Sequence, residues 1–524
     1  MDRLRILALL ALVAVPYITA LNHDFVYDDH GSIVENAYLQ ESGHIRDVLG
    51  LRTLTDLSVP DGRRPTVLLS YMADRSLWGL RPLGFHATSL LIHLCNTLLV
   101  LALARKFVAP GSKLLPFGTA LLFGLHPVLI EAVQSPAFRE DLLVTFFLLS
   151  YLLLATRRDT SAWFSAVPLI LALLSKETAV IGPLLLFAIW FCLPALRPPT
   201  RRATGLAVYG IAAIFIFVGL WMASGPLQAS GDIAYGTELR YPHNLLTLPY
   251  LWLKMLRIII APYPLVVDYV IRPVRSIVEP RFIAGALAVL ASLTLFLALR
   301  RRQPLVALGL GWMMIAFVPA SNMLPLYNPF AERYLYCVVP GFALAFASLL
   351  ATPSSTRLRT ILLACTATAY ACLAILRLAD WRTDLDLWSR AIQDQPYSAR
   401  AFTWVGLEMK HQRDPRGAML MFRAASALNP KDISPLINMA IIEGEDGRLA
   451  EAETLLREAV QRRPDKADAH WNLAVALQLQ GKTNEAQAEI TRTLEQDPRH
   501  PAALSVRSAT KAIPHDTDKG MPLD

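Results

Sequence analysis

Two adjacent carboxylates, Asp28 and Asp29, stand in the segment HDFVYDDHGSIVEN, directly after the first apolar run of the chain. A carboxylate at this position can take a proton from the hydroxyl of an acceptor, and the pair can also hold a divalent cation such as Mg²⁺ or Mn²⁺. Beyond that cation, the sequence indicates no cofactor. The alternative is a capped loop, because Asp is common at helix N-termini.

A second set of charged residues stands in the first loop and at the edges of later apolar runs. The phosphate of a lipid-linked sugar lies at the level of the membrane surface, where Arg and Lys can bind it and stabilise its departure. For any single residue the alternative is a local ion pair or a side chain that extends to the interface. We expect His126 and Glu131 to share one helix face. The candidates for substrate binding are Arg63, Arg64, His126, Glu131, Arg139, Asp141, Lys176, Glu177, Glu332 and Arg333.

The elements that must position these residues are apolar helices. Hydrophobic residues make up 54% of the chain and charged residues 18%, against about 25% in a typical soluble protein. The shortage of charge lies before residue 380, in runs long enough to suggest membrane helices. The runs are 4–21, 86–104, 114–130, 141–156, 161–175, 178–196, 203–223, 244–262, 281–299, 304–320, 334–351 and 358–378.

Clusters of Lys and Arg between these runs indicate the side of the membrane, because such clusters favour the cytoplasm. An even number of crossings must separate consecutive clusters, yet three runs lie between Arg202 and Arg300. The weakest of them, 244–262, contains Pro249 and two cations, so we interpret it as an interfacial helix on the outer side. The pattern then predicts about 11 spans, a cytoplasmic N-terminus and an outer loop at 22–85 that carries the acidic pair.

The C-terminal part has a repeat. Pro396, Pro430, Pro464 and Pro498 recur every 34 residues, which is the period of tetratricopeptide (TPR) repeats. Such arrays form an α-solenoid with a concave groove for extended peptides, and the alternative is a packing or oligomerisation module. The same topology places this array on the outer side of the membrane.

The predicted fold class is therefore all-α, a polytopic helical bundle followed by a TPR solenoid. We expect a transmembrane domain at 1–379, a TPR domain at 380–512 and a disordered tail at 513–524. The net charge of +8 is spread over short clusters between apolar runs, which argues against a nucleic-acid partner. No nucleotide-binding loop or nucleophile elbow stands in a suitable context, which disfavours nucleotide-driven chemistry.

Several motifs in combination resemble the transmembrane-and-TPR O-mannosyltransferase family, within the type C glycosyltransferase fold. They are FVYDDH, RRPTVLLSY (63–71), LLFGLHPVLIEAV (121–133), REDLL (139–143), SKE (175–177), AERYLY (331–336) and DWRTDLDLW (380–388), followed by the repeats. One departure is Glu140, which stands where the family usually has a small residue.

This resemblance implies an inverting transfer of a sugar, usually mannose, from a polyprenyl-phosphate donor to a Ser or Thr hydroxyl of a protein. By the same match, Asp28 or Asp29 is the general base. The resemblance and the positions together imply that Arg139, Lys176 and Arg333 face the lipid phosphate. Compact loops and the lack of organelle signals suggest a bacterial inner-membrane protein with periplasmic repeats.

Two other functions remain open at this point. A membrane-anchored TPR scaffold for envelope assembly needs an anchor, but it does not need many spans with charge on one side. A transporter usually carries polar groups in the middle of the membrane, and these runs are nearly free of them.

Overall fold

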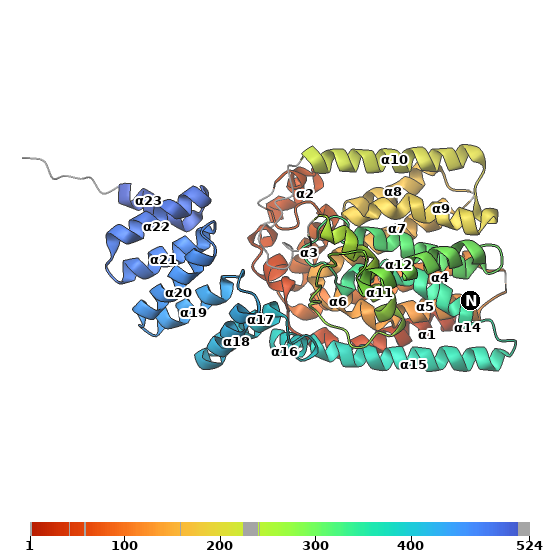
Figure 1. Ribbon diagram of the computed structural model, residues 1–524. Coiled ribbons are helices and arrows are strands. Elements are labelled where there is room, and N and C mark those ends of the chain that lie inside the picture. Colours follow the sequence, from red (N-terminus) through yellow and green to blue (C-terminus); the bar gives the residue numbers. More distant parts are fainter. Residues whose placement is uncertain are drawn as a thin grey trace, which may run out of the picture. The chain divides into compact units, whose positions relative to one another are not determined.

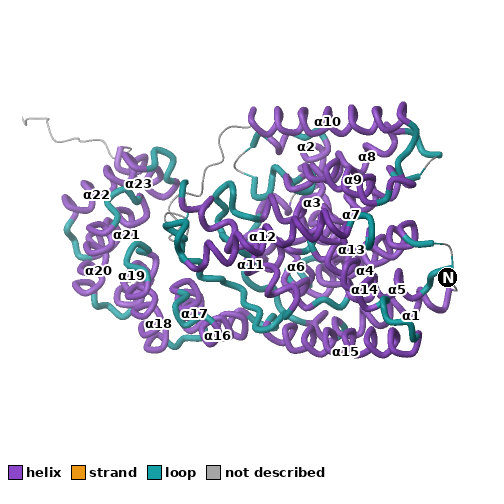
Figure 2. The backbone as a smooth tube through the Cα atoms, turned by 45° about the vertical axis from the view of Figure 1, so that its right-hand side comes forward, coloured by secondary structure: helices purple, strands orange, loops and turns teal. Residues whose placement is uncertain are grey.

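The computed structural model describes residues 3–40, 42–56, 59–109, 111–157, 159–223, 239 and 241–511. Within these ranges the chain is helical and contains no strand (Figure 2), which confirms the all-α class for the described part. The contacts divide the chain into a membrane unit, Met1–Gln395, and a repeat unit, Pro396–Asp524. The predicted tail at 513–524 lies outside the described residues.

The membrane unit is a bundle of helices around α4, which contacts α5 and α7. The long helices α10 and α15 lie on opposite sides of it (Figures 1 and 2). Its α-helices are α1 (Arg3–Ala14), α2 (Ile45–Leu49), α3 (Pro65–Trp78), α4 (Pro82–Phe107), α5 (Leu114–Gly124), α6 (Ile130–Gln134), α7 (Arg139–Ala155), α8 (Ala162–Leu173), α9 (Gly182–Cys192), α10 (Thr200–Ala223), α11 (His243–Ile260), α12 (Pro280–Leu299), α13 (Pro304–Phe317), α14 (Val339–Leu350), α15 (Thr356–Asp380) and α16 (Asp384–Asp394).

Four described helices are long and apolar enough to cross a membrane, namely α4, α10 over Thr200–Leu220, α12 and α15. A fifth candidate is the pair Leu114–Gly124 and Pro127–Gln134, which is bent by 46°. The expected count of about 11 spans is therefore not confirmed, although the chain is a multi-pass membrane protein.

Proline accounts for part of the difference between the expected number of spans and the number of long apolar helices. Several apolar runs form helices of 10–17 residues instead of full spans. The helix α13 begins at Pro304, and α9 and α14 have Pro183 and Pro340 in their first turn, where a missing N–H costs nothing. A 12-residue helix such as α14 rises only about 18 Å, less than the ~30 Å of a hydrocarbon core.

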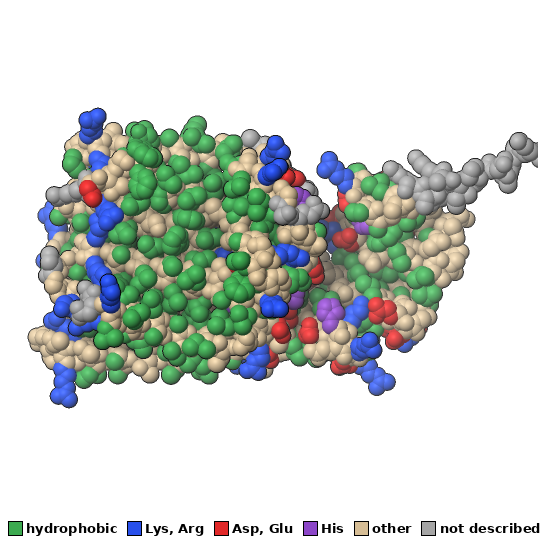
Figure 3. All heavy atoms as spheres, turned by 180° about the vertical axis from the view of Figure 1, so that it is seen from behind, with side chains coloured by type: hydrophobic (Ala, Val, Ile, Leu, Met, Phe, Trp, Pro, Cys, Tyr) green, Lys and Arg blue, Asp and Glu red, His purple; other side chains and the backbone are tan. Residues whose placement is uncertain are grey.

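The surface of the membrane unit carries a broad hydrophobic belt on the face drawn in Figure 3. Lys and Arg dominate one rim of this belt, whereas acidic, basic and His side chains mix on the other. A belt between two charged rims is the surface that a lipid bilayer requires.

The segment predicted to lie in the interface forms α11, which is not among the candidate spans of the described chain. One of its sides is buried and carries Thr247, Leu251, Met255 and Ile258. Arg257 on the same helix is exposed. The buried side packs within the protein, against α12 among others, and the interfacial interpretation stays a prediction.

The repeat unit contains α17 (Ala399–His411), α18 (Pro415–Leu428), α19 (Ser434–Glu445), α20 (Leu449–Arg462), α21 (Ala467–Leu479), α22 (Thr483–Gln496) and α23 (Pro501–Lys511). The pairs α17–α18, α19–α20 and α21–α22 each pack together, and neighbouring pairs pack on one another. Gly406 stands where α17 and α18 approach closely, because a Cβ atom there would come within 2.7 Å of the Phe422 ring.

The division between the units falls after Gln395, not at the expected boundary after residue 379. The segment 380–395, which we expected to open the TPR domain, belongs to the membrane unit. Its helix α16 packs on the loop that follows α1, where the Trp388 ring meets the edge of Tyr27 with centroids 5.2 Å apart. Both side chains are buried in this contact.

Candidate active site

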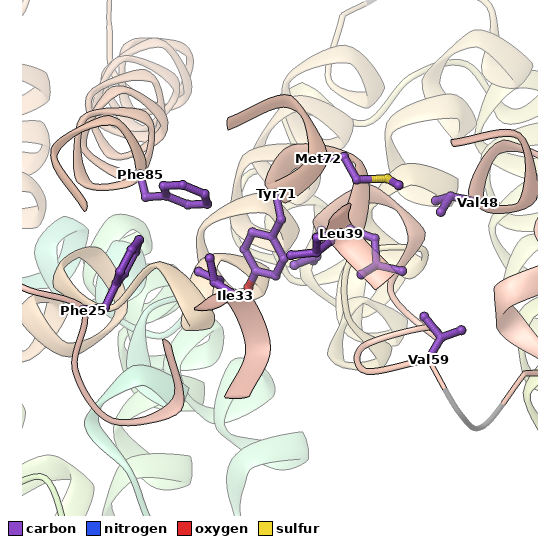
Figure 4. Close-up of a cluster of buried hydrophobic side chains, with 10 residues drawn as sticks. Phe25, Ile33, Leu39, Val48, Val59, Tyr71, Met72 and Phe85 are labelled. Atoms are coloured by element: carbon purple, nitrogen blue, oxygen red, sulfur yellow. The ribbon is translucent and has the colours of Figure 1, made fainter. Parts of the chain in front are cut away.

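The loop that carries the acidic pair has its own hydrophobic core (Figure 4). Phe25, three residues before Asp28, meets Phe85 of α4 edge to face at 5.3 Å between centroids. Because this core contains side chains of α2, α3 and α4, it holds the loop in one conformation. Its members are Phe25, Ile33, Leu39, Val48, Val59, Val67, Leu68, Tyr71, Met72 and Phe85.

Asp29 is fully buried, and hydrogen bonds occupy both of its carboxylate oxygens. Oδ1 accepts from Ser135 Oγ at 2.8 Å and from the backbone N–H of Ala137 at 2.7 Å, and Oδ2 accepts from the Val26 N–H at 3.1 Å. Burial raises the pKa of Asp29 to about 7, against the effect of these hydrogen bonds. Asp29 therefore ties the loop to the start of α7.

Asp28 is only partly buried. Its charge raises the pKa of Asp61 and of Arg333, so it lies within electrostatic reach of both. For Asp61 the main cause of the raised pKa is burial, and Arg64 opposes it. Of the two adjacent carboxylates, Asp28 is the more exposed.

The residue before the pair, Tyr27, has a left-handed backbone with φ of +59°. Its N–H donates to Oδ1 of Asp384 at 2.8 Å, and the other oxygen of Asp384 lies 2.7 Å from His30 Nε2. A strained conformation of this kind persists only where its surroundings determine it. The start of α16 thus clamps the acidic loop on both sides of Asp28 and Asp29. Neither Asp384 nor His30 was predicted as a site residue, and their only signals were the strings DWRTDLDLW and FVYDDH in which they stand.

Arg64 lies at the centre of an ion-pair network next to this loop. Its Nη1 donates to Glu140 Oε1 at 3.1 Å and to Asp61 Oδ1 at 3.3 Å. Its Nη2 lies 3.9 Å from Glu177 Oε2. The structure thereby brings together residues of the first loop, the start of α7 and the SKE segment. Its neighbour Arg63 is partly buried.

Lys176 extends the same network. Its ammonium donates to Asp141 Oδ1 at 2.6 Å, lies 3.6 Å from Glu140 Oε1 and stands 5.5 Å from the centroid of the Tyr334 ring. Burial lowers the pKa of Lys176, but the carboxylates of Asp141 and Glu140 outweigh it and the pKa is raised. Lys176 is therefore a buried cation that two carboxylates neutralise.

Arg333 and Glu131 form a second buried pair. Arg333 donates to Glu131 through Nη1 and also through its backbone N–H, which lies 3.0 Å from Oε2. The guanidinium also lies over the rings of Phe138 and Tyr334, at 4.1 and 4.9 Å. Glu131 is fully buried, so Arg333 is its compensating charge.

Glu332 belongs to a third buried pair. It accepts hydrogen bonds from Tyr269 Oη at 2.9 Å and from Arg377 Nη2 at 3.2 Å. Burial raises the pKa of Glu332 to about 7, although Arg377 lowers it. The sequence did not predict either partner, because each comes from a distant segment.

The structure contradicts two expectations. Arg139 does not face a ligand, because it is fully buried. Its guanidinium forms an ion pair with Asp74 at 2.6 Å and donates hydrogen bonds to the Phe85 carbonyl and to Ser70 Oγ. The helix α3 contributes Asp74 and Ser70 and so covers the first residue of α7.

His126 and Glu131 do not share a helix face. The break after Gly124 turns His126 toward Tyr370 and toward the Ile259 carbonyl, 3.0 Å from its Nε2, whereas Glu131 faces Arg333. Five residues, rather than the three or four of neighbours on one face, also separate them.

Several acidic side chains of the site face a cation, among them Glu131, Glu140 and Asp141. In the part of the chain that the structure describes, no three His, Cys, Asp or Glu side chains come together as metal ligands. The possible use of Mg²⁺ or Mn²⁺ stays a prediction, and no step below passes through a metal.

Comparison with known proteins identifies relatives of both units. A family model described as a tetratricopeptide repeat matches residues 445–509. The chain is 26% identical over 419 residues to a protein O-mannosyl-transferase of Caenorhabditis elegans, which covers 75% of this chain and 58% of the relative. It is 27% identical over 507 residues to one of Homo sapiens, with coverage of 81% and 55%. The chain thus spans less than two thirds of the length of these curated relatives.

Among solved structures, the chain resembles ArnT from Cupriavidus metallidurans, a structure bound to undecaprenyl phosphate. The two align with a TM-score of 0.42 and 15% identity over 90% of this chain and 80% of that one. This TM-score is too low to establish a common fold, so the sequence relatives carry the assignment. They confirm the resemblance seen in the motifs, and the chain is a relative of the transmembrane-and-TPR protein O-mannosyltransferases.

Proposed function

We propose that this protein is a membrane glycosyltransferase that moves a sugar, mannose by its relatives, from a polyprenyl-phosphate donor to a Ser or Thr hydroxyl of a protein. The observation that carries the proposal is the unequal state of the two adjacent carboxylates. Asp29 is buried and accepts hydrogen bonds on both carboxylate oxygens. Asp28 is partly exposed, on a loop that contacts hold from both sides.

Asp28 acts as the general base in this scheme. It takes the proton of the acceptor hydroxyl while the oxygen forms a bond to the anomeric carbon from the face opposite the phosphate. The bond between that carbon and the phosphate oxygen breaks, and its electron pair leaves with the polyprenyl phosphate. Attack from the opposite face inverts the anomeric configuration.

The location follows from the charge pattern. The proposed site faces the outer side of a bacterial inner membrane, with the N-terminus in the cytoplasm and the repeats in the periplasm. The groove of the repeat unit then binds an extended segment of the acceptor protein. A bilayer and a lipid-linked donor are the other partners, and no nucleic acid is involved.

The alternative function is a non-catalytic TPR scaffold that assembles envelope proteins. Asp28→Asn separates the two in a strain that carries the variant at the native locus. Mass spectrometry of periplasmic proteins and glycolipids should show the loss of sugar adducts, while partner proteins still copurify. The matched control is Asp47→Asn in the same loop, where Asp47 pairs with the exposed Arg52. Unchanged adducts in Asp28→Asn would favour the scaffold.

A further inference from the structure

Lys254 occupies an unusual position on α11. It stands three residues after Leu251 and four before Ile258, so it lies beside the buried stripe of the helix, where an apolar residue is expected. Burial lowers the pKa of its ammonium to about 8, and the nearby Arg257 adds to this effect. A buried ammonium needs compensation from an anion or from polarisable groups.

In the described part of the chain, two aromatic rings face the ammonium. The Lys254 ammonium lies 4.6 Å from the centroid of Tyr269 and 5.8 Å from that of Phe330. Within the described part of the chain its Nζ forms no ion pair and no hydrogen bond, and no carboxylate contributes to its pKa. The rings hold the cation in place and leave its three N–H donors open.

The cations of the ion-pair networks described above are neutralised within the protein. Arg64 and Lys176 face Glu140 and its neighbours, and Arg333 faces Glu131. A phosphate that approached them would meet these carboxylates as well. An anion binds best where a positive charge lacks an internal counter-ion, and Lys254 meets that condition.

Lys254 is connected to the acidic site through one side chain. Tyr269, whose ring lies under the ammonium, donates its hydroxyl to Glu332, and Glu332 is the neighbour of Arg333 in the chain. Arg333 in turn is within electrostatic reach of Asp28. The helix α11 itself is the predicted interfacial element, at the level where lipid headgroups lie.

We propose that Lys254 binds the phosphate of the lipid-linked donor, with Tyr269 and Phe330 as the aromatic platform that holds its ammonium. This inference rests on the proposed function. It replaces the expectation that Arg139, Lys176 and Arg333 contact that phosphate directly.

The test measures binding separately from transfer, on the full-length protein in lipid nanodiscs. The probes are polyprenyl phosphate without a sugar, the matching polyprenol and inorganic phosphate. Lys254→Gln should weaken the binding of polyprenyl phosphate at least about tenfold, the usual scale for one charge-assisted contact, and leave polyprenol unchanged. Lys254→Arg should keep most of the affinity because it keeps the charge. Lys113→Gln, at an exposed lysine before α5, should bind like the wild type.

The variants also separate this inference from the proposed function. Asp28→Asn should bind polyprenyl phosphate normally and transfer no sugar. Equal affinity of Lys254→Gln and the wild type for polyprenyl phosphate would overturn the role of Lys254 and leave the function standing. If Lys254→Gln has a folding defect, it will bind polyprenol more weakly as well. The Lys254→Arg variant then tests the proposal in its place, and a loss of polyprenyl-phosphate binding by Lys254→Arg would contradict it. Binding of inorganic phosphate as tight as that of the lipid would show a site for free phosphate, which again contradicts it.

Discussion

The membrane unit and the repeat unit use charged residues in opposite ways. In the repeats, ion pairs such as that of Arg457 with Glu453 at 2.7 Å lie on the surface, and the interior around Phe422 is apolar. One pair there, His470 with Glu489 at 2.6 Å, is buried. In the membrane unit the pairs of Arg139, Lys176 and Arg333 are buried or nearly so.

Burying charge costs several kcal/mol per ion, which a well-packed apolar core would avoid. The repeats show that this chain can build such cores by itself. The buried charges of the membrane unit are therefore best explained by chemistry at the acidic loop. Each prediction below tests this contrast, beginning with the largest effect.

Asp28→Asn should lower the rate of sugar transfer by about 10²–10⁴-fold, the usual contribution of a general base. The protein should fold normally, because Asp28 is partly exposed. The rate is measured with a purified acceptor peptide and a labelled donor. A rate within threefold of the wild type, where about threefold is less than 1 kcal/mol, would remove Asp28 from the mechanism.

Glu131→Gln should destabilise the membrane unit by about 3–5 kcal/mol, because it leaves the buried Arg333 without a counter-charge. The shift is measured by thermal unfolding in detergent. In the double variant Glu131→Gln/Arg333→Met much of the loss should be recovered. No recovery would mean that packing, and not the uncompensated charge, causes the loss.

His30 and Asp384 should make transfer dependent on pH. The hydrogen bond from Asp384 raises the pKa of His30 above its ordinary value near 6.5, against the effect of burial. The ion pair between His30 and Asp384 is thus fully formed at a pH below the ordinary pKa of His. It weakens as the pH rises through the raised pKa of His30. We expect the rate of sugar transfer to fall severalfold as the pH rises through the raised pKa of His30. This fall should be absent in His30→Gln.

Asp384→Asn supplies the matching control for this step. It keeps an oxygen to accept from the Tyr27 N–H but removes the charge that raises the pKa of His30. The step should therefore move to lower pH. An unchanged pH profile in both variants would show that the clamp does not control the loop.

The smallest effect is expected in the repeats. Arg457→Ala removes exposed pairs with Glu453 and Glu485 and should change stability by less than about 1 kcal/mol. Thermal unfolding of the full chain measures it. A loss as large as that of Glu131→Gln would mean that the two units do not differ in how they use charge.

The repeat array and the acidic pair could be predicted because their signals are local. A proline every 34 residues fixes the period, and the pair Asp28 and Asp29 directly follows an apolar run. The partners of these carboxylates could not be predicted, since they come from distant segments. Asp384 lies 357 residues from Tyr27, and Glu140 lies 76 residues from Arg64.

The error at Arg139 has a similar origin. Its position at the end of an apolar run indicated exposure to the outer side. Only the tertiary structure shows that Asp74 of α3 and Phe85 of α4 cover it. In the sequence, Lys254 counted only as a charge that weakened a candidate span. That it has no carboxylate partner in the described part of the chain is a property of the folded chain.

The central claim is that Asp28 drives an inverting transfer from a polyprenyl-phosphate sugar. The most direct test is a single-turnover reaction of the purified wild-type protein and of Asp28→Asn with polyprenyl-phosphate mannose and a Ser/Thr peptide, with the anomeric configuration of the product read by NMR. The account predicts a glycopeptide of inverted configuration from the wild type and none from the variant. A product of retained configuration, or equal product from both proteins, would contradict it.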